Sequence, residues 1–264
     1  MRLWASVGLG AAAGAGAALA LRWLQPKGLW TPTEDDGVLE ERGESPPEAD
    51  TPSSAEGRAL IERLGRQGGM TPEQVQFLVF VAAKESRFWP NVGRGDPKLR
   101  PPGLRTFWAD LHEADAARKA YTRNAGLFAD CGHPAEAYSF GSGGLFGFLP
   151  VYPLYHFRQT PLRCAHPYAV FDPPFSMAAA YSFARGLSRH PAFDGTVVEL
   201  RAGWGSLARM QDPQSYAAKR PPWSVQLREL GIDAAWLDAP APHWPKRDLM
   251  DLYHSMGGQL ARDA

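Results

Sequence analysis

The sequence TPEQVQFLVFVAAKESRFWP, residues 71–90, decides the fold class of this 264-residue chain. Its beginning is typical of a helix start: Thr71 is placed as the N-cap, Pro72 follows at the first helical position, and Gln74 can close a capping box. The residues after Gln74 are apolar on nearly all sides, which predicts a buried helix. We expect the helix to run to Glu85 and to stop before Pro90.

Glu85 stands at the end of this helix, close to Phe88 and Trp89. An apolar surrounding disfavours the charged form of a carboxyl group. A carboxyl group that keeps its proton can act as a general acid on a glycosidic oxygen. Glu85 is therefore the candidate catalytic residue. Taken alone, the pattern favours a plainer interpretation, in which Glu85 is exposed at the helix end and paired with Lys84 or Arg87.

Most of the chain from residue 53 onward shows helical periodicity. Asp172 and Pro173 mark a helix start, and apolar side chains then recur on one face of residues 177–190. No long alternating pattern typical of strands is visible, so the sequence predicts a mainly α domain over residues 55–264. Further helices are expected near residues 53–67, 106–121, 196–201, 223–230 and 247–260.

A glycine-rich loop, SFGSGGLFGFLP, occupies residues 139–150. Glycine allows backbone to approach a ligand closely, and the three phenylalanines indicate that the loop is packed. A phosphate-binding loop is not indicated, because no Lys-Ser/Thr pair follows the glycines. The loop is a candidate wall of a binding site, or a connection with no ligand.

Residues 1–25 contain an uncharged run from Leu3 to Leu21, flanked by Arg2 and Arg22. The run is long enough to cross a bilayer, so it predicts a transmembrane anchor. A signal peptide cut after Ala20 is the alternative, because Ala18-Leu19-Ala20 fits the small-x-small rule. Both interpretations place the rest of the chain outside the cytoplasm, whereas a third, a buried core helix, does not.

Residues 26–54 form an acidic, proline-rich linker with few apolar side chains, which predicts disorder and a spacer role. Over the whole chain, 28 basic residues balance 28 acidic ones and the formal net charge is zero. Nucleic-acid binding usually requires a basic excess, so a nucleic-acid partner is not expected.

The chain has two cysteines, Cys131 and Cys164. In an exported protein, two cysteines predict one disulfide. A pair of free buried thiols is one alternative. A zinc site is another, because His133 and His166 each follow a cysteine by two residues, but this spacing is not a standard zinc pattern. We therefore expect no metal.

Motifs in a fixed order resemble the lysozyme-like superfamily, specifically the soluble lytic transglycosylase and goose-type lysozyme group. The resemblance extends over residues 71–206 and departs from the family at Gly147, where the family usually has Gln. The gap between Glu85 and the glycine-rich loop is also longer than usual. The motifs are Glu85-Ser86 with a later Pro90, Ser142-Gly143-Gly144-Leu145-Phe146 with a later Pro150, Asp172-Pro173 with Ala178-Ala179-Ala180-Tyr181, and, more weakly, Trp204-Gly205.

The resemblance implies a helical lysozyme-like domain that cleaves the bond between N-acetylmuramic acid and N-acetylglucosamine in peptidoglycan, without a cofactor. Glu85 would act as general acid and then as base in a lytic transglycosylase, which forms an anhydro sugar. Tyr181 would lie near Glu85. The implied substrate-binding residues are Ser86, Ser142, Gly144, Leu145, Phe146, Tyr181 and Trp204.

Two alternatives stay open. A hydrolytic lysozyme needs a second carboxylate to position water, and Asp96 and Asp172 are the candidates. A degenerate lysozyme-like domain would instead bind peptidoglycan or build an envelope or phage virion assembly, an interpretation motivated by Gly147. If the N-terminal helix is a membrane anchor, the catalytic domain lies in the periplasm. There it would open the cell wall locally, as in secretion or phage entry.

Overall fold

The computed structural model describes residues 54–90, 111–138 and 142–259. The anchor and linker predicted for residues 1–53 lie outside the described residues, as does Asp96. None of the described helices combines the length and the apolar character needed to cross a membrane.

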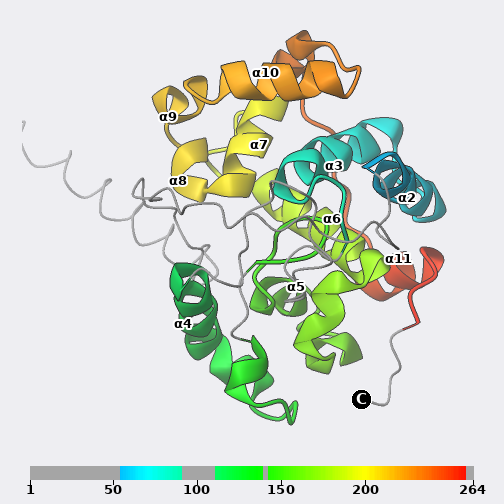
Figure 1. The fold of residues 1–264 in the computed structure, drawn as a ribbon, viewed down its shortest axis with the longest axis vertical. Coiled ribbons are helices and arrows are strands. Elements are labelled where there is room, and N and C mark those ends of the chain that lie inside the picture. Colours follow the sequence, from blue (N-terminus) through cyan, green and yellow to red (C-terminus); the bar gives the residue numbers. More distant parts are fainter. Residues whose placement is uncertain (1–53, 91–110, 139–141, 260–264) are drawn as a thin grey trace, which may run out of the picture.

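The described part of the chain is mainly α-helical, as predicted, and its β pairing is limited to two isolated bridges (Figure 1). Four short 3-10 helices lie between the α-helices, at Ala135–Tyr138, Pro161–Cys164, Pro167–Phe171 and Ala234–Asp238. The α-helices are α2 (Ser54–Gln67), α3 (Pro72–Glu85), α4 (Leu111–Phe128), α5 (Val151–His156), α6 (Pro173–Leu187), α7 (Val197–Gly205), α8 (Leu207–Met210), α9 (Pro213–Ala217), α10 (Arg220–Glu229) and α11 (Leu249–Ser255).

Helix α3 forms as its sequence predicts. The Thr71 side chain accepts a hydrogen bond from the backbone N–H of Gln74, and the Gln74 side chain accepts one from the backbone N–H of Thr71, which completes the capping box. Nearly every residue from Val75 to Ala82 is buried. The helix is covered by α2 on one side and α10 on another, so its last residue, Glu85, is held by a rigid core element.

Helix α6 is the central element and contacts α2, α5, α7 and α11 (Figure 1). Its N-cap is Asp172, whose carboxylate accepts a hydrogen bond from the N–H of Phe175. The small side chains of residues 178–180 are completely buried, which allows neighbouring helices to approach closely.

Several elements differ from the sequence prediction. Helix α4 ends at Phe128, beyond the predicted end at residue 121, and the short helices α8 and α9 were not predicted. Helix α7 continues through Trp204 and Gly205, beyond the predicted helix of residues 196–201. Helix α11 is shorter than the predicted segment. Helix α5, which directly follows the glycine-rich loop, was not predicted, because it has six residues and contains Pro153.

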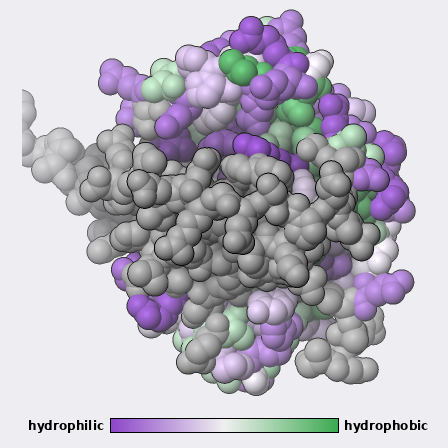
Figure 2. Space-filling model, in the orientation of Figure 1, coloured by the Kyte–Doolittle hydropathy of each residue, from purple (hydrophilic) through white to green (hydrophobic). Residues whose placement is uncertain are grey.

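The coloured surface in Figure 2 is mostly hydrophilic, and hydrophobic residues form small separate patches. Among the described residues, the large hydrophobic side chains that are exposed are Tyr168 and Val225. The described surface therefore offers no broad apolar face for a partner.

Candidate functional site

Glu85 is the last residue of α3 and is followed by an unusual turn. Arg87 and Phe88 have positive φ angles of 50° and 70°, a left-handed conformation that is unfavourable for residues with a side chain. Gly57 of α2 packs directly against the carbonyl oxygen of Phe88, and any side chain at position 57 would collide with it. The close approach of α2 therefore supports the strained turn behind Glu85.

The carboxylate of Glu85 is paired with Arg201 of α7. Arg201 Nη2 donates to Glu85 Oε1 at 2.7 Å. The Arg201 side chain is only 1% exposed and its guanidinium packs over the rings of Phe80 and Trp223, whereas the Glu85 side chain is 26% exposed. The pair therefore joins a buried cation to a carboxylate that solvent can reach.

This pairing corrects the environment that was predicted for Glu85. The sequence suggested apolar neighbours, or an ion pair with Lys84 or Arg87. The structure instead places a long-range cation, Arg201, against the carboxylate. A buried guanidinium needs a compensating charge, and it stabilises negative charge on Oε1.

The glycine-rich loop lies directly beside Glu85, although about sixty residues separate them in the sequence. The hydroxyl of buried Ser86 donates to the carbonyl oxygen of Leu145 at 2.8 Å, with Ala82 O as a second acceptor at 3.1 Å. A Cβ atom on Gly147 would lie 3.4 Å from Glu85 Cβ and 3.5 Å from Glu85 Oε2. The structure thus brings together Glu85, Ser86 and the loop.

Gly147, the position where the family usually has Gln, lies directly beside Glu85. Its φ is +63°, a conformation that favours glycine. Because it has no side chain, its backbone lies close to Oε2. Gly147 is also the one residue between Ser142 and Pro150 that is not buried.

The other described residues of the glycine-rich loop are buried. The side chains of Leu145 and Phe146 are buried, and the rings of Phe146 and Phe148 pack against Trp204 at 6.0 and 5.7 Å between centroids. Gly144 packs against the carbonyl oxygen of Val170, where a Cβ atom would collide. These residues form a packed floor.

This burial corrects several expected roles. Ser86 was expected to bind substrate, but its hydroxyl holds the loop against α3. Ser142 and Trp204 are also buried. In this conformation the side chains of Ser86, Ser142, Leu145, Phe146 and Trp204 support the site from below.

Tyr181 is at the opposite end of α3 from Glu85. Its hydroxyl donates to Pro245 O, its ring packs on Trp244, and Gln74 is a hydrogen-bond neighbour. Gln74 and Glu85 are eleven residues apart on one helix, which corresponds to roughly 16 Å. The expectation that Tyr181 lies near Glu85 is therefore wrong.

Two further cations lie close enough to sense the charges of Glu85 and Arg201. The pKa of both Lys84 and Arg209 is lowered, mainly by burial and also by the charge of Arg201. The negative charge of Glu85 partly opposes this lowering. Arg209 is half-buried, and Lys84 reaches the surface although neighbouring residues partly desolvate it. The surroundings of Glu85 are thus rich in positive charge.

Glu85 does not line either of two cavities found among the described residues. One, of about 520 Å³, lies at the N-terminal end of α3 and includes Glu73, Tyr181, His243 and Arg247. The other, of about 300 Å³, lies between α2 and α3.

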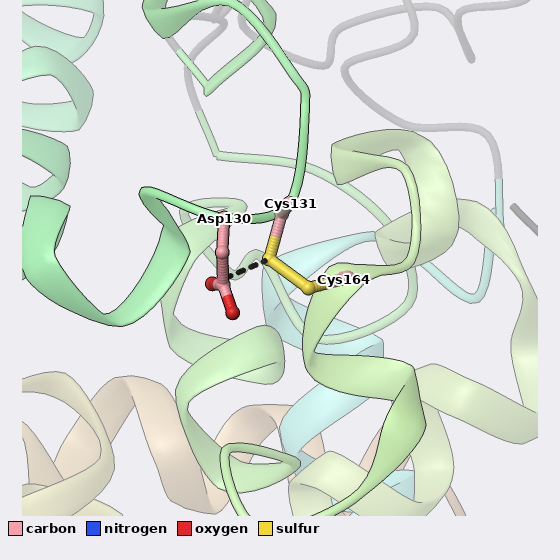
Figure 3. Close-up of side chains that lie close together, drawn as sticks. All are labelled: Asp130, Cys131 and Cys164. Atoms are coloured by element: carbon pink, nitrogen blue, oxygen red, sulfur yellow. Dashed lines mark hydrogen bonds between the residues drawn. A yellow bond between two sulfur atoms is a disulfide. The ribbon is translucent and has the colours of Figure 1, made fainter.

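Cys131 and Cys164 are joined by a disulfide, with Asp130 beside it (Figure 3). The rings of His133 and His166 are 5.1 Å apart, and His133 Nε2 hydrogen-bonds Cys164 O. The four ligands of the alternative zinc site are thus neighbours. Sulfur atoms bonded to each other are not thiolates, so they do not offer the ligands that zinc requires.

Of the two candidates for a second carboxylate, Asp172 lies among the residues that the structure describes. Asp172 is the N-cap of α6, and burial raises its pKa while the hydrogen bond from Phe175 opposes this rise. Its carboxylate is occupied in capping. Asp96 lies outside the described residues.

Sequence reasoning missed Arg201. The signal was present, because Arg201 stands inside the apolar run VVELRAGWG of residues 197–205. A cation in a buried helix face requires a partner. Only the fold shows that this partner is Glu85.

Comparisons with protein-family models, with curated proteins and with solved structures found no match for this chain. A functional assignment therefore depends on the geometry of the site and on the motif resemblance.

Proposed function

We propose that this chain is a peptidoglycan lytic transglycosylase with Glu85 as its general acid and base. The observation that carries the proposal is the arrangement of the carboxylate. Oε1 is fixed by the buried Arg201, and Oε2 faces the side-chain-free position of Gly147. One oxygen is held in place while the other faces backbone that carries no side chain.

In the first step, Glu85 would bind a proton on Oε2, although Arg201 favours its carboxylate form, and transfer it to the glycosidic oxygen between N-acetylmuramic acid and N-acetylglucosamine. The bond from this oxygen to the muramoyl carbon breaks. The acetamido group of the substrate stabilises the resulting cation, so a second protein carboxylate is not required. Arg201 keeps Oε1 in place during the transfer.

In the second step, Glu85 is a carboxylate and takes a proton from the muramoyl 6-hydroxyl. The 6-oxygen then bonds to the cationic carbon, which gives the anhydro sugar and restores the acid form of Glu85. Arg201 stabilises the negative charge that Glu85 carries between the steps. Ser86 and the packed loop keep Gly147 beside the reacting oxygen.

We also propose where the protein lies in the cell, on the basis of its N-terminal segment. An anchor in residues 1–25 and an acidic spacer in residues 26–54 would hold the domain in the periplasm, at the membrane. A tethered enzyme of this kind opens the wall locally. Its partners are the glycan strands and the lipid bilayer.

The test is digestion of purified peptidoglycan followed by mass spectrometry of the soluble products. We expect products lighter by one water than those of hydrolysis, and we expect Glu85→Gln to release none above background. Circular dichroism and thermal unfolding would verify that the variant is folded. Hydrolysed products would favour the lysozyme alternative, and equal release by the two proteins would overturn the proposal.

A second candidate is a lysozyme-like domain that binds peptidoglycan, or builds an envelope or virion assembly, without cleaving it. The observation in its favour is that Glu85 is in an ion pair and lines neither described cavity. Structural ion pairs have this geometry as well. Co-sedimentation with peptidoglycan by a chain that releases no fragments would support it.

A further inference from the structure

The larger cavity, at the start of α3, has no part in the cleavage steps proposed for Glu85. Its volume of about 520 Å³ lies within the range of roughly 300–1,000 Å³ that ligand pockets have. One wall comes from the start of α3 and the turn before it, and the other comes from the proline-rich segment of residues 240–247. Gln74 in its lining is roughly 16 Å from Glu85 along the helix. The cavity is therefore a separate candidate binding site.

The wall of residues 240–247 is held in place by the core. The Gln74 side chain donates a hydrogen bond to the carbonyl oxygen of His243. The Tyr181 hydroxyl donates one to the carbonyl oxygen of Pro245 at 3.0 Å. Prolines in the segment restrict its backbone further, because each fixes its own φ angle. The cavity is thus formed before a ligand arrives, which lowers the entropic cost of binding.

Two cations of this wall, Lys246 and Arg247, line the cavity. Within the described ranges no carboxylate lies at ion-pair distance from either of them. Arg247 Nη1 donates to the carbonyl oxygen of Gly68, and its guanidinium carbon lies 5.9 Å from the centre of the Tyr181 ring. A guanidinium has five N–H donors, and the others have no hydrogen-bond partner among the described residues. The cavity therefore offers charged donors to an anionic ligand.

A third charged residue, Glu73, restricts which anion the cavity accepts. A hydrogen bond from the backbone at the helix start and one from Thr71 lower the pKa of Glu73, so its carboxyl group is ionised at neutral pH. This negative charge in the lining disfavours a phosphate group, which carries close to two negative charges. It is compatible with a ligand that carries single carboxylates together with an ammonium group. A peptide has this combination of charges.

We infer that this cavity binds the peptide stem of peptidoglycan, with a carboxylate of the stem held by Lys246 and Arg247. The inference rests on the proposed function, which makes peptidoglycan the polymer that the domain meets. Stem peptides carry carboxylates and, at their diamino acid, an amine, which matches the charges of the lining. Because the cavity is distant from Glu85, it holds the domain on the wall and does not act on the glycosidic bond.

The test is titration calorimetry with a synthetic stem pentapeptide and with the same peptide after every carboxylate has been converted to an amide. The wild-type chain should bind the free-acid peptide roughly tenfold or more tightly, the effect of a hydrogen bond between charged groups. Lys246→Gln and Arg247→Gln should each lower this ratio toward one. Lys119→Gln, which removes an exposed lysine of α4, should leave it unchanged.

Lys246→Gln is the more decisive variant, because the Lys246 side chain is exposed and makes no hydrogen bond or ion pair within the described ranges. Glu85→Gln should bind the free-acid peptide as tightly as the wild type does. Preference for the free acid by a chain that cleaves nothing supports the cavity and counts against the proposed function alone. Equal affinity of the wild type for the two peptides, or binding of neither, overturns the inference and leaves cleavage by Glu85 standing.

Discussion

The two ends of α3 each carry a glutamate, and the two glutamates lie in opposite settings. Glu73 is exposed in the first turn, where the helix N-terminus and Thr71 stabilise its charge and lower its pKa. Glu85 lies in the last turn, where the helix gives no such support, and is held by Arg201, which is 116 residues away in the sequence. The charge of Glu73 is stabilised by neighbouring residues at the helix start, whereas the charge of Glu85 is stabilised by a residue that only the tertiary fold brings close.

The difference shows where chemistry can be placed on a rigid helix. At the Thr71 end, capping residues, a hydrogen bond from Gln74 to His243 and a tyrosine in core packing form an ordinary helix start. At the Glu85 end, a strained turn, a buried cation and a close glycine meet one carboxylate. Such features cluster at functional sites. The predictions below alter one end at a time.

The largest effect is expected from Arg201→Met, which removes the buried charge from the Glu85 end. Glu85 loses its partner, and we expect a loss of about 3 kcal/mol in the free energy of unfolding. The double variant Arg201→Met/Glu85→Leu should recover part of this loss, because no unpaired charge remains. Urea denaturation of the wild type, Arg201→Met, Glu85→Leu and the double variant measures the coupling. Additive losses would show that the two side chains do not interact.

A smaller effect is expected from Gly144→Ala. Gly144 has a φ of +72° and packs against the Val170 carbonyl oxygen, so we expect a loss of roughly 2–3 kcal/mol. The matched control is Gly69→Ala at the other end of α3, where φ is +61° and the nearest atom is the movable Arg247 guanidinium at 3.5 Å. Its loss should be about 1 kcal/mol. Equal losses in thermal unfolding would contradict the packing of Gly144.

Thr71→Ala removes the N-cap at the locally satisfied end of the helix. A lost cap typically destabilises a protein by about 1 kcal/mol, and chemical denaturation would measure this. Cleavage of peptidoglycan at a temperature well below the unfolding midpoint should be unchanged. A large loss of cleavage by the folded variant would show that the two ends are coupled.

The smallest effect is a pH dependence at α5, which supports the glycine-rich loop. His156 hydrogen-bonds Ser182 and packs on Phe183, and burial, assisted by Arg158, lowers its pKa from 6.5 to about 4. Between these values the unfolded chain binds more protons than the folded one, so stability falls as pH falls. From pH 7 to pH 6 we expect His156 to account for roughly 0.5 kcal/mol. Urea midpoints of wild type and His156→Gln should then differ in pH dependence, and parallel curves would refute this.

The parts of the structure that depend on short-range chemistry could be predicted. Thr71, Pro72 and Gln74 define the start of α3, and Asp172 and Pro173 define that of α6, because caps are encoded within a few residues. Helix α5 was missed because a six-residue helix that contains Pro153 has no clear periodicity. Helix α7 was predicted to end at residue 201, because Gly203 and Gly205 follow and glycine is unfavourable inside a helix.

The candidate site was predictable only in part. Glu85 and the glycine-rich loop were expected to meet through the order of motifs in a family, and the structure places them side by side. The partner of Glu85 was not predictable, because an ion pair across 116 residues leaves no local pattern. Tyr181 was placed at the wrong end of α3, because its partners Pro245 and Trp244 come from a distant segment of the chain and leave no local pattern.

The central claim is that the Glu85 end of α3 is catalytic and the Glu73 end is not. The most direct measurement is the rate at which purified peptidoglycan is solubilised by the wild-type chain, Glu85→Gln and Glu73→Gln at equal concentrations of folded protein. We expect Glu85→Gln to be slower by at least about 100-fold and Glu73→Gln to match the wild type. Equal rates for Glu85→Gln and the wild type, or no solubilisation by any of the three, would contradict the claim.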